Sequence, residues 1–356
     1  MKTIVVLLFT LCSFNIFGQF YSIDKATLAE IENHGVIFEL LPESENDIPE
    51  VPAKKKANKK NETADDYPEF NKTLNDAAKR SLAKYWKLTK GTVEFKTQKE
   101  ISVLALNDVK NKVIITCGWI TKDTKYQGML YLYSFHIKYV NSENKEAQLF
   151  EFEYTPYTEV NDADIIFFAK TMTQIKEVSM KYEVYKESHV FTENIKIVES
   201  KTLLADSALL GKKSGIEDIT KVYPHKFEIT SKEVIEKAII DECDTCMFFK
   251  PVYSKKNGML MFDVFDTKDM KILAAIGTGG VTFKLGAKPG MRTTYERKFS
   301  PGSGGGGYYY YDSKTTHTPI NEIGTGGKTL WKSPMTIGPG HFKLILSEGA
   351  QKMNFK

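Results

Sequence analysis

Two cysteines stand at the spacing of a redox motif in ECDTCMFF, residues 242–249. A Cys-x-x-Cys dithiol attacks disulfides when one thiol is ionised, and a helix N-terminus beside that thiol favours ionisation. Here a helical pattern, SKEVIEKAII, precedes the cysteines and a strand-like run follows them. Cys243 and Cys246 are therefore expected at the carbonyl end of a helix, where the dipole and three neighbouring acids oppose thiolate formation. The sequence favours a structural disulfide, the rival interpretation being a thiol oxidoreductase.

The other residue types that carry chemistry are scattered. No histidine forms an HExxH pair or stands at metal-ligand spacing to a cysteine, and no GxSxG motif is present. The stretch EIGTGGKT, residues 322–329, has Glu322 where a phosphate-binding loop needs glycine. We therefore expect no catalytic, cofactor-binding or metal-ligating residue, and no cofactor, unless the fold gathers distant residues. The six histidines are His34, His136, His189, His225, His317 and His341.

A glycine run beside four tyrosines marks SPGSGGGGYYYYDS, residues 300–313. One interpretation is a long hairpin loop that enters a strand whose alternate tyrosines cover a sheet. The other is an adaptable contact surface, because tyrosine gives large amphipathic area and glycine gives reach. On the second interpretation, Tyr308, Tyr309, Tyr310 and Tyr311 contact an envelope protein, a glycan or a peptide.

The N-terminal stretch MKTIVVLLFTLCSFNIFGQF has the pattern of an export signal, with Lys2 before an apolar core and Gly18 before the expected cleavage point. No later segment is apolar enough to span a bilayer. Cleavage removes Lys2 and no acid, so the formal charge falls by one from +4. This small, evenly spread charge gives no reason to expect nucleic acid as a partner. We expect a periplasmic or secreted protein.

The rest of the chain shows a charged linker and an apparent repeat. Residues 42–66 hold three prolines, alternating blocks of charge and almost nothing apolar, which predicts a flexible segment. Beyond it, TQKEISVLAL and TSKEVIEKAII each follow a short strand, with Thr97 and Glu100, and Thr230 and Glu233, as capping boxes. Three strand-like runs follow each helix.

The predicted fold class is α+β, with two similar modules, each a helix, a strand, a helix and an antiparallel meander, and a glycine-rich β extension. The expected parts are a signal peptide (1–18), an N-terminal segment (19–41), the linker (42–66), module 1 (67–160), a connecting helix (161–195), module 2 (196–280) and the Gly/Tyr-rich β extension (281–356).

This order of elements, together with YWKLTKGTVEF and VYPHKFEI, resembles the amino-terminal domain of TolB and related envelope modules. In its overall character the chain also resembles uncharacterised exported proteins of Bacteroidetes-type bacteria. The resemblance covers about residues 68–280 and carries no functional residue over. It implies an interaction role in the envelope.

The function expected from the sequence is therefore an exported, non-catalytic binding or assembly protein of the bacterial cell envelope. The alternative is a secreted hydrolase or other enzyme whose site is assembled from scattered residues. A deep pocket with converging His, Asp or Glu side chains, especially on residues present in only one of the two modules, would favour the enzyme.

Overall fold

The computed structural model describes residues 23–44, 47, 68–124, 128–141, 143, 145–154, 160–181, 187–211, 215–255, 258–277, 290–301, 307–318 and 337–345. The expected signal peptide and residues 45, 46 and 48–66 of the expected linker lie outside them. Within the described residues the fold is α+β, as the sequence predicts.

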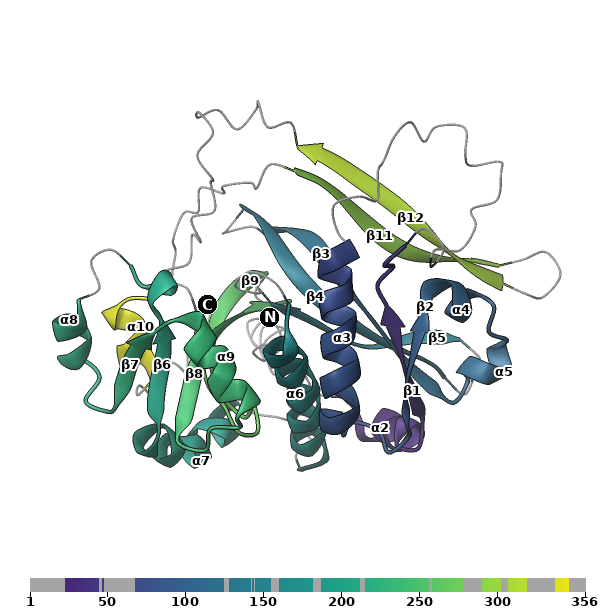
Figure 1. The fold of residues 1–356 in the computed structure, drawn as a ribbon. Helices are drawn as coiled ribbons and strands as arrows, with labels where there is room; N and C mark the ends of the chain where they lie inside the picture. Colours follow the sequence, from purple (N-terminus) through teal and green to yellow (C-terminus); the bar gives the residue numbers. More distant parts are fainter. Residues whose placement is uncertain are drawn as a thin grey trace, which may run out of the picture.

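A mixed sheet of ten strands runs through the described residues (Figure 1). In its first half, β1 (Gly35–Leu40) lies between β2 (Val93–Thr97) and β3 (Lys112–Thr124) and is parallel to both. β3, β4 (Gly128–Val140) and β5 (Glu146–Tyr154) then form an antiparallel meander.

The second half has the same order of pairing. β6 (Thr202–Asp206) lies between β7 (Phe227–Thr230) and β8 (Cys246–Ser254) and is parallel to both. β8, β9 (Met259–Asp266) and β10 (Ile272–Gly277) form the second antiparallel meander.

The two halves join at β8, where the sheet forks. β6 pairs with the first residues of β8, up to Leu204 opposite Phe248. β5 meets β8 further along, with Tyr154 opposite Val252. Lys250 therefore lies at the fork, between the ends of β5 and β6.

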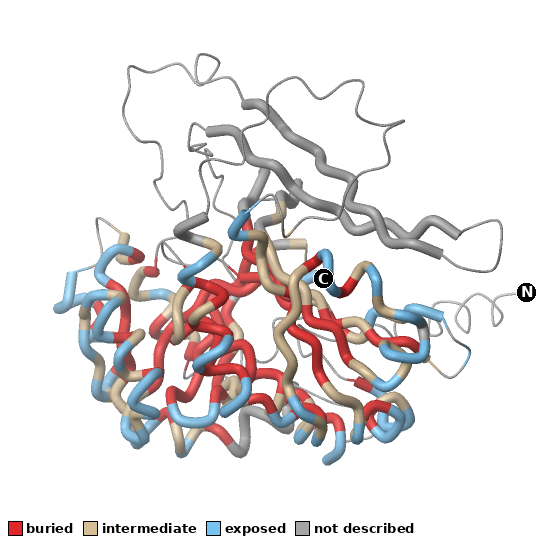
Figure 2. The backbone as a smooth tube through the Cα atoms, turned by 45° about the vertical axis from the view of Figure 1, so that its right-hand side comes forward, coloured by how far each residue is buried: buried red, intermediate tan, exposed pale blue. Residues whose placement is uncertain are grey.

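Helices cover both sides of the sheet (Figure 1). We call one side the α6 face, because its core contains buried residues of α2, α3, α6 and α9. The other is the α7 face, with a core formed by α7, α8 and α10 and a small cluster under α4 and α5. Figure 2 shows the buried residues along the strands and the exposed residues on the outer helices. The bounds are α2 (Lys25–Ile31), α3 (Pro68–Tyr85), α4 (Gln98–Ser102), α5 (Leu106–Val109), α6 (Asp162–Lys181), α7 (Glu187–Ser200), α8 (Ile216–Thr220), α9 (Lys232–Ile240) and α10 (Pro339–Ile345).

Elements in the same position of the two halves lie on opposite faces of the sheet. α3 follows β1 on the α6 face, whereas α8 follows β6 on the α7 face; α4 and α9 are exchanged in the same way. The cause is the strand direction. Because β8 is antiparallel to β5, each strand of the second half points opposite to its counterpart in the first, and corresponding helices therefore pack on opposite faces. A duplication stays a prediction, which superposition of the halves would test.

The structure corrects the sequence analysis at three points. The segment 19–41 contains β1, an inner strand of the first half, and β1 and β6 add parallel pairing to sheets predicted as antiparallel. The second capping box is wrong, because Ser231 rather than Thr230 is the N-cap of α9 and makes no side-chain cap hydrogen bond. The Thr97 capping box is confirmed.

α6 begins with acids in its first turn, which suits the positive end of a helix dipole. Its ring of Phe167 lies 5.4 Å from that of Phe152 in the first half and 4.8 Å from that of Phe265 in the second. α6 therefore packs against both halves. Within the segment 161–195 expected as one connecting helix, the structure has α6 and the start of α7.

The predicted β extension contains both strands and a helix. β11 (Gly290–Pro301) and β12 (Gly307–Thr318) form a separate antiparallel pair, and β11 lies next to β3. The helix α10 packs into the second half, where the ring of Phe342 lies 5.4 Å from that of Phe249.

Candidate functional site

Three side chains that together can carry acyl-transfer chemistry meet on β4 and β5. His136 lies directly opposite Glu151, and Ser134 stands two residues before His136 on β4. Because alternate residues of a strand point to the same side, all three share the α7 face. Tyr133 and Phe135, between and beside them, turn into the core of the α6 face.

The three groups lie in the order of a nucleophile, a general base and an orienting acid. Ser134 Oγ is 3.0 Å from His136 Nε2, and His136 Nδ1 is 3.7 Å from Glu151 Oε1. The second carboxylate oxygen of Glu151 is ion-paired with Lys255. The side chains of His136 and Glu151 are 27% and 13% exposed, and Ser134 is fully buried. A hydroxyl hydrogen-bonded to an imidazole beside a carboxylate is the arrangement that activates serine nucleophiles.

Gly118 leaves room beside Ser134. It lies directly opposite Ser134 on β3, so a side chain there would share the α7 face with Ser134. Among the residues that the structure describes, a Cβ placed on Gly118 would meet no atom within 4 Å, which indicates open space at this position. Glycine in a strand often marks a place where a ligand approaches the backbone closely.

A second group of polar side chains lies inside the molecule, at the fork of the sheet. Lys250 Nζ donates to Asp164 Oδ1 at 2.9 Å, and both side chains are 5% exposed. The same ammonium lies 4.8 Å from the ring centroid of Tyr154 and 5.4 Å from that of Phe167. Contact with aromatic faces partly replaces the lost hydration of the charge.

Two more carboxyl groups interact electrostatically with this ammonium. Burial raises the pKa of Asp206, at the end of β6, while the N–H of Ala208 and, less strongly, Lys232 and Lys250 oppose the rise. Burial also raises the pKa of Glu236 on α9, against a hydrogen bond with Asn161 and the same two lysines. The fork thus gathers acids from three elements around one interior lysine.

The remaining polar groups on the α6 face are not activated. Burial raises the pKa of the Cys117 thiol to about 12. Burial, with smaller contributions from neighbouring groups, raises the pKa of Tyr133 and Tyr154 well above the usual range for tyrosine. All three groups are therefore protonated at neutral pH, and none is an activated nucleophile. We interpret the interior group as structural.

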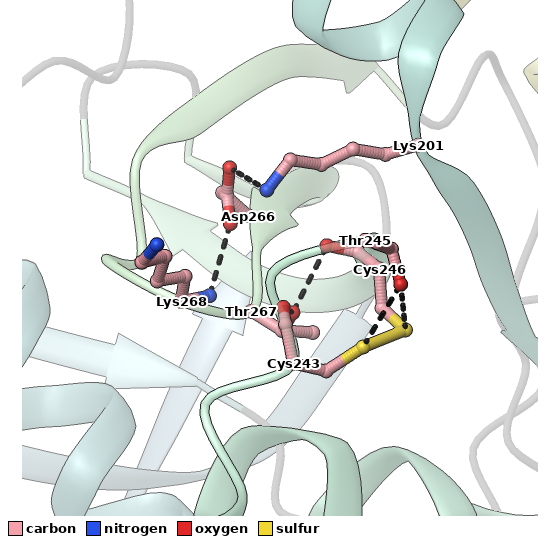
Figure 3. Close-up of a disulfide and its surroundings, with 7 residues drawn as sticks. All are labelled: Lys201, Cys243, Thr245, Cys246, Asp266, Thr267 and Lys268. Atoms are coloured by element: carbon pink, nitrogen blue, oxygen red, sulfur yellow. Dashed lines mark hydrogen bonds and ion pairs between the residues drawn. A yellow bond between two sulfur atoms is a disulfide. The ribbon is translucent and has the colours of Figure 1, made fainter.

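Cys243 and Cys246 form a disulfide at the turn between α9 and β8, on the side away from the Lys201–Asp266 ion pair (Figure 3). The Thr267 hydroxyl donates to the carbonyl oxygens of both cysteines. The N–H of Cys243 donates to a carbonyl of α9, as expected at the C-terminal end of a helix. The structure therefore has the pair as a disulfide at the position that the sequence predicts.

The tyrosine segment falls on β12. Tyr308 pairs with Ser300 and Tyr311 with Arg297, so the backbone is a strand. The four tyrosine side chains lie outside what the structure describes, as do residues 302–306, which include three of the four consecutive glycines. In the described part of the chain, no group of three or more His, Cys, Asp or Glu side chains is placed to hold a metal ion.

No family model, no curated protein and no solved structure matches this chain. Function is therefore argued from the residues alone.

The Ser134 group has a weak signal in the sequence, which the motif search does not detect. Ser134-Phe-His136 and Glu151-Phe-Glu153 alternate polar and aromatic residues, which predicts polar groups on one face of each strand. Which carboxylate meets His136 depends on a bulge between Ile137 and Lys138, where the ladder register shifts. Without that shift, His136 would lie opposite Phe150.

Proposed function

We propose that this chain is an exported binding or assembly protein of the bacterial cell envelope, periplasmic or secreted. The disulfide supports an oxidising compartment, because such bonds are rare in the cytosol. No helix in the described ranges is long and apolar enough to cross a membrane.

The observation that carries the binding role is the hairpin of β11 and β12. Its strands are twelve residues each and pair with no other strand that the structure describes. Their outer edges, of which that of β11 lies next to β3, therefore have no partner in a described ladder, and such an edge can accept an added strand, a common mode of peptide recognition. An isolated hairpin is marginally stable in water, so a partner would stabilise it.

A pull-down from envelope extracts tests this role. The wild-type chain should recover a partner that is lost when Tyr308 to Tyr311 are changed to Ser. The melting temperature should stay nearly unchanged, because these residues are assigned to contact rather than to the core. Changing Lys54, Lys55 and Lys56 to Ser is the matched control and should leave recovery intact. A large loss of stability in the tyrosine variant would contradict the assignment.

A second candidate function, a hydrolase with a site assembled from scattered residues, has one specific observation in its favour. Ser134, His136 and Glu151 converge from two strands, and none is part of a sequence motif. The chemistry that this group supports is independent of the binding role.

A further inference from the structure

We propose that Ser134 is an acyl-accepting nucleophile, with His136 as its general base and Glu151 as a positioning residue, and that its substrates are small carboxylic esters. The first support is geometric. The 3.0 Å distance from Ser134 Oγ to His136 Nε2 lies within reach for proton transfer. Glu151 lies on the Nδ1 side of the same ring, and in the tautomer with a proton on Nδ1 the lone pair of Nε2 accepts the serine proton.

The position of Glu151 depends on a local irregularity of the sheet. The bulge in β5 shifts the register so that Glu151 rather than Phe150 faces His136. Bulges are frequent next to active sites, where they redirect a side chain. Lys255 pairs with the other oxygen of Glu151 and adds a second contact that orients the carboxylate beside the imidazole.

The group occurs in only one half of the molecule. The two halves can be aligned by the registers of their strand ladders, with β3 corresponding to β8. In this alignment the helix N-caps Thr97 and Ser231 take the same position. In this alignment the second half has no hydroxyl where Ser134 stands, no imidazole where His136 stands and no carboxylate where Glu151 stands. Gly118, Ser134, His136 and Glu151 correspond to Val252, Met261, Asp263 and Ala275.

The substrate class follows from the space available. Ser134 is fully buried, so a bulky acyl group cannot reach its hydroxyl. The open position at Gly118, directly across the strand pair, admits a group of a few atoms. In the second half the corresponding residue, Val252, is a buried part of the core. Acetyl and similarly short acyl esters fit this description.

The reaction balances with water as the only co-reactant. Ser134 Oγ attacks the ester carbonyl carbon while His136 Nε2 takes the hydroxyl proton, and the tetrahedral intermediate expels the alkoxide, which takes that proton. Water then attacks the acyl-serine with the same base and releases the carboxylic acid. The N–H groups of β4 are hydrogen-bonded within the sheet and supply no oxyanion hole. Each donor of such a hole typically raises kcat by on the order of 10²–10³-fold. Acylation and deacylation both pass through a tetrahedral intermediate, so we expect slow turnover. An activated aryl ester, whose leaving group departs easily, should acylate Ser134 faster than water releases the acyl group and should therefore give a burst.

The test uses the full chain with p-nitrophenyl acetate and with a fluorophosphonate probe. The expected result is a stoichiometric burst of nitrophenol and a single labelled peptide that contains Ser134. Ser134→Ala should abolish both, and His136→Gln should slow labelling by roughly 100-fold, the loss of a general base. Labelling of another serine, or equal labelling in Ser134→Ala, would overturn the proposal.

Two further variants separate chemistry from folding. Gly118→Val should block labelling without lowering the melting temperature, because it fills open space and leaves the three groups intact. Glu151→Gln should move the pH midpoint of labelling to lower pH, because the imidazole loses a nearby negative charge. His225→Asn, a control outside the group, should change nothing. An unchanged labelling rate in Gly118→Val would also contradict the proposal. Partner recovery by Ser134→Ala reports on the binding role separately.

Discussion

Lys250 of β8 and Asp164 of α6 form an ion pair of 2.9 Å in the interior, at the point where the two halves of the sheet meet. Both side chains are almost completely removed from water, so each charge depends on the other for part of its compensation, beside the aromatic rings and the other acids at the fork. Breaking a buried pair by removing one partner typically costs about 3–5 kcal/mol.

We therefore expect Lys250→Met and Asp164→Asn each to lower the free energy of unfolding by about 3–5 kcal/mol in denaturant titrations. Lys250→Met combined with Asp164→Leu should cost less than the sum of its two single changes, since no charge is then left alone. The exposed pair Lys221–Asp218 has the same 2.9 Å distance and serves as the control. Its removal should cost less than about 1 kcal/mol. Equal losses at the two sites would contradict the interpretation.

Asp263 predicts a pH dependence of stability. It is 2% exposed, and burial raises its pKa well above the ordinary 3.8. The folded state then holds the proton more tightly than the unfolded state, so this group's contribution is full below pH 3.8 and is lost as pH rises towards the folded pKa. The loss is about 1.4 kcal/mol per pH unit in that window.

Asp263→Asn removes this titration. The variant should be more stable than wild type at neutral pH, and the difference should disappear below about pH 3.8. Urea unfolding across pH 3–8 measures it, with the exposed Asp218→Asn as control. A variant less stable than wild type at pH 7 would show that the carboxylate has a stabilising partner.

The corrected helix cap gives a direct comparison of two threonines. Thr97 accepts from the N–H of Glu100 at 3.2 Å, and Glu100 accepts from the N–H of Thr97 at 2.6 Å. Thr97→Ala should therefore cost about 1 kcal/mol. Thr230→Ala should cost less than about 0.5 kcal/mol, because Thr230 precedes the cap of its helix. Similar losses of stability in the two variants would show that Thr230 caps its helix, as the sequence predicts.

These threonines also show what the sequence could and could not predict. The order of helices and strands follows from local periodicity and turn residues, and the structure has it nearly as expected. β1 was missed because its partners, β2 and β3, lie far beyond the linker, and parallel pairing leaves no turn signal between strands. The sequence pattern favours Thr230 as the N-cap of the second helix, whereas the structure has Ser231. This difference shifts the alignment of the two halves by one residue, and a shift of one residue places each strand side chain on the opposite face.

The candidate site was less predictable than the fold. Its three groups meet only because the strands pair in one register, and a single bulged residue sets that register. Local patterns indicate which face a side chain takes, but they do not indicate where a ladder slips by one position. The disulfide could be predicted because its cysteines are three residues apart.

That disulfide carries the last prediction. Cys243 and Cys246 follow the C-terminal end of α9, where the helix dipole is negative and Asp244 adds charge, so a thiolate is disfavoured there. The chain should therefore show no insulin reduction with dithiothreitol above the rate of Cys243→Ser. Changing both cysteines to Ser should lower the free energy of unfolding by about 2 kcal/mol, the entropic effect of so short a loop. Thr267→Val, which removes the hydroxyl that donates to both cysteine carbonyls, should add a separate loss in denaturant titrations, since it acts on the folded turn. Reductase turnover that is lost on Cys243→Ser would instead make the pair a working dithiol.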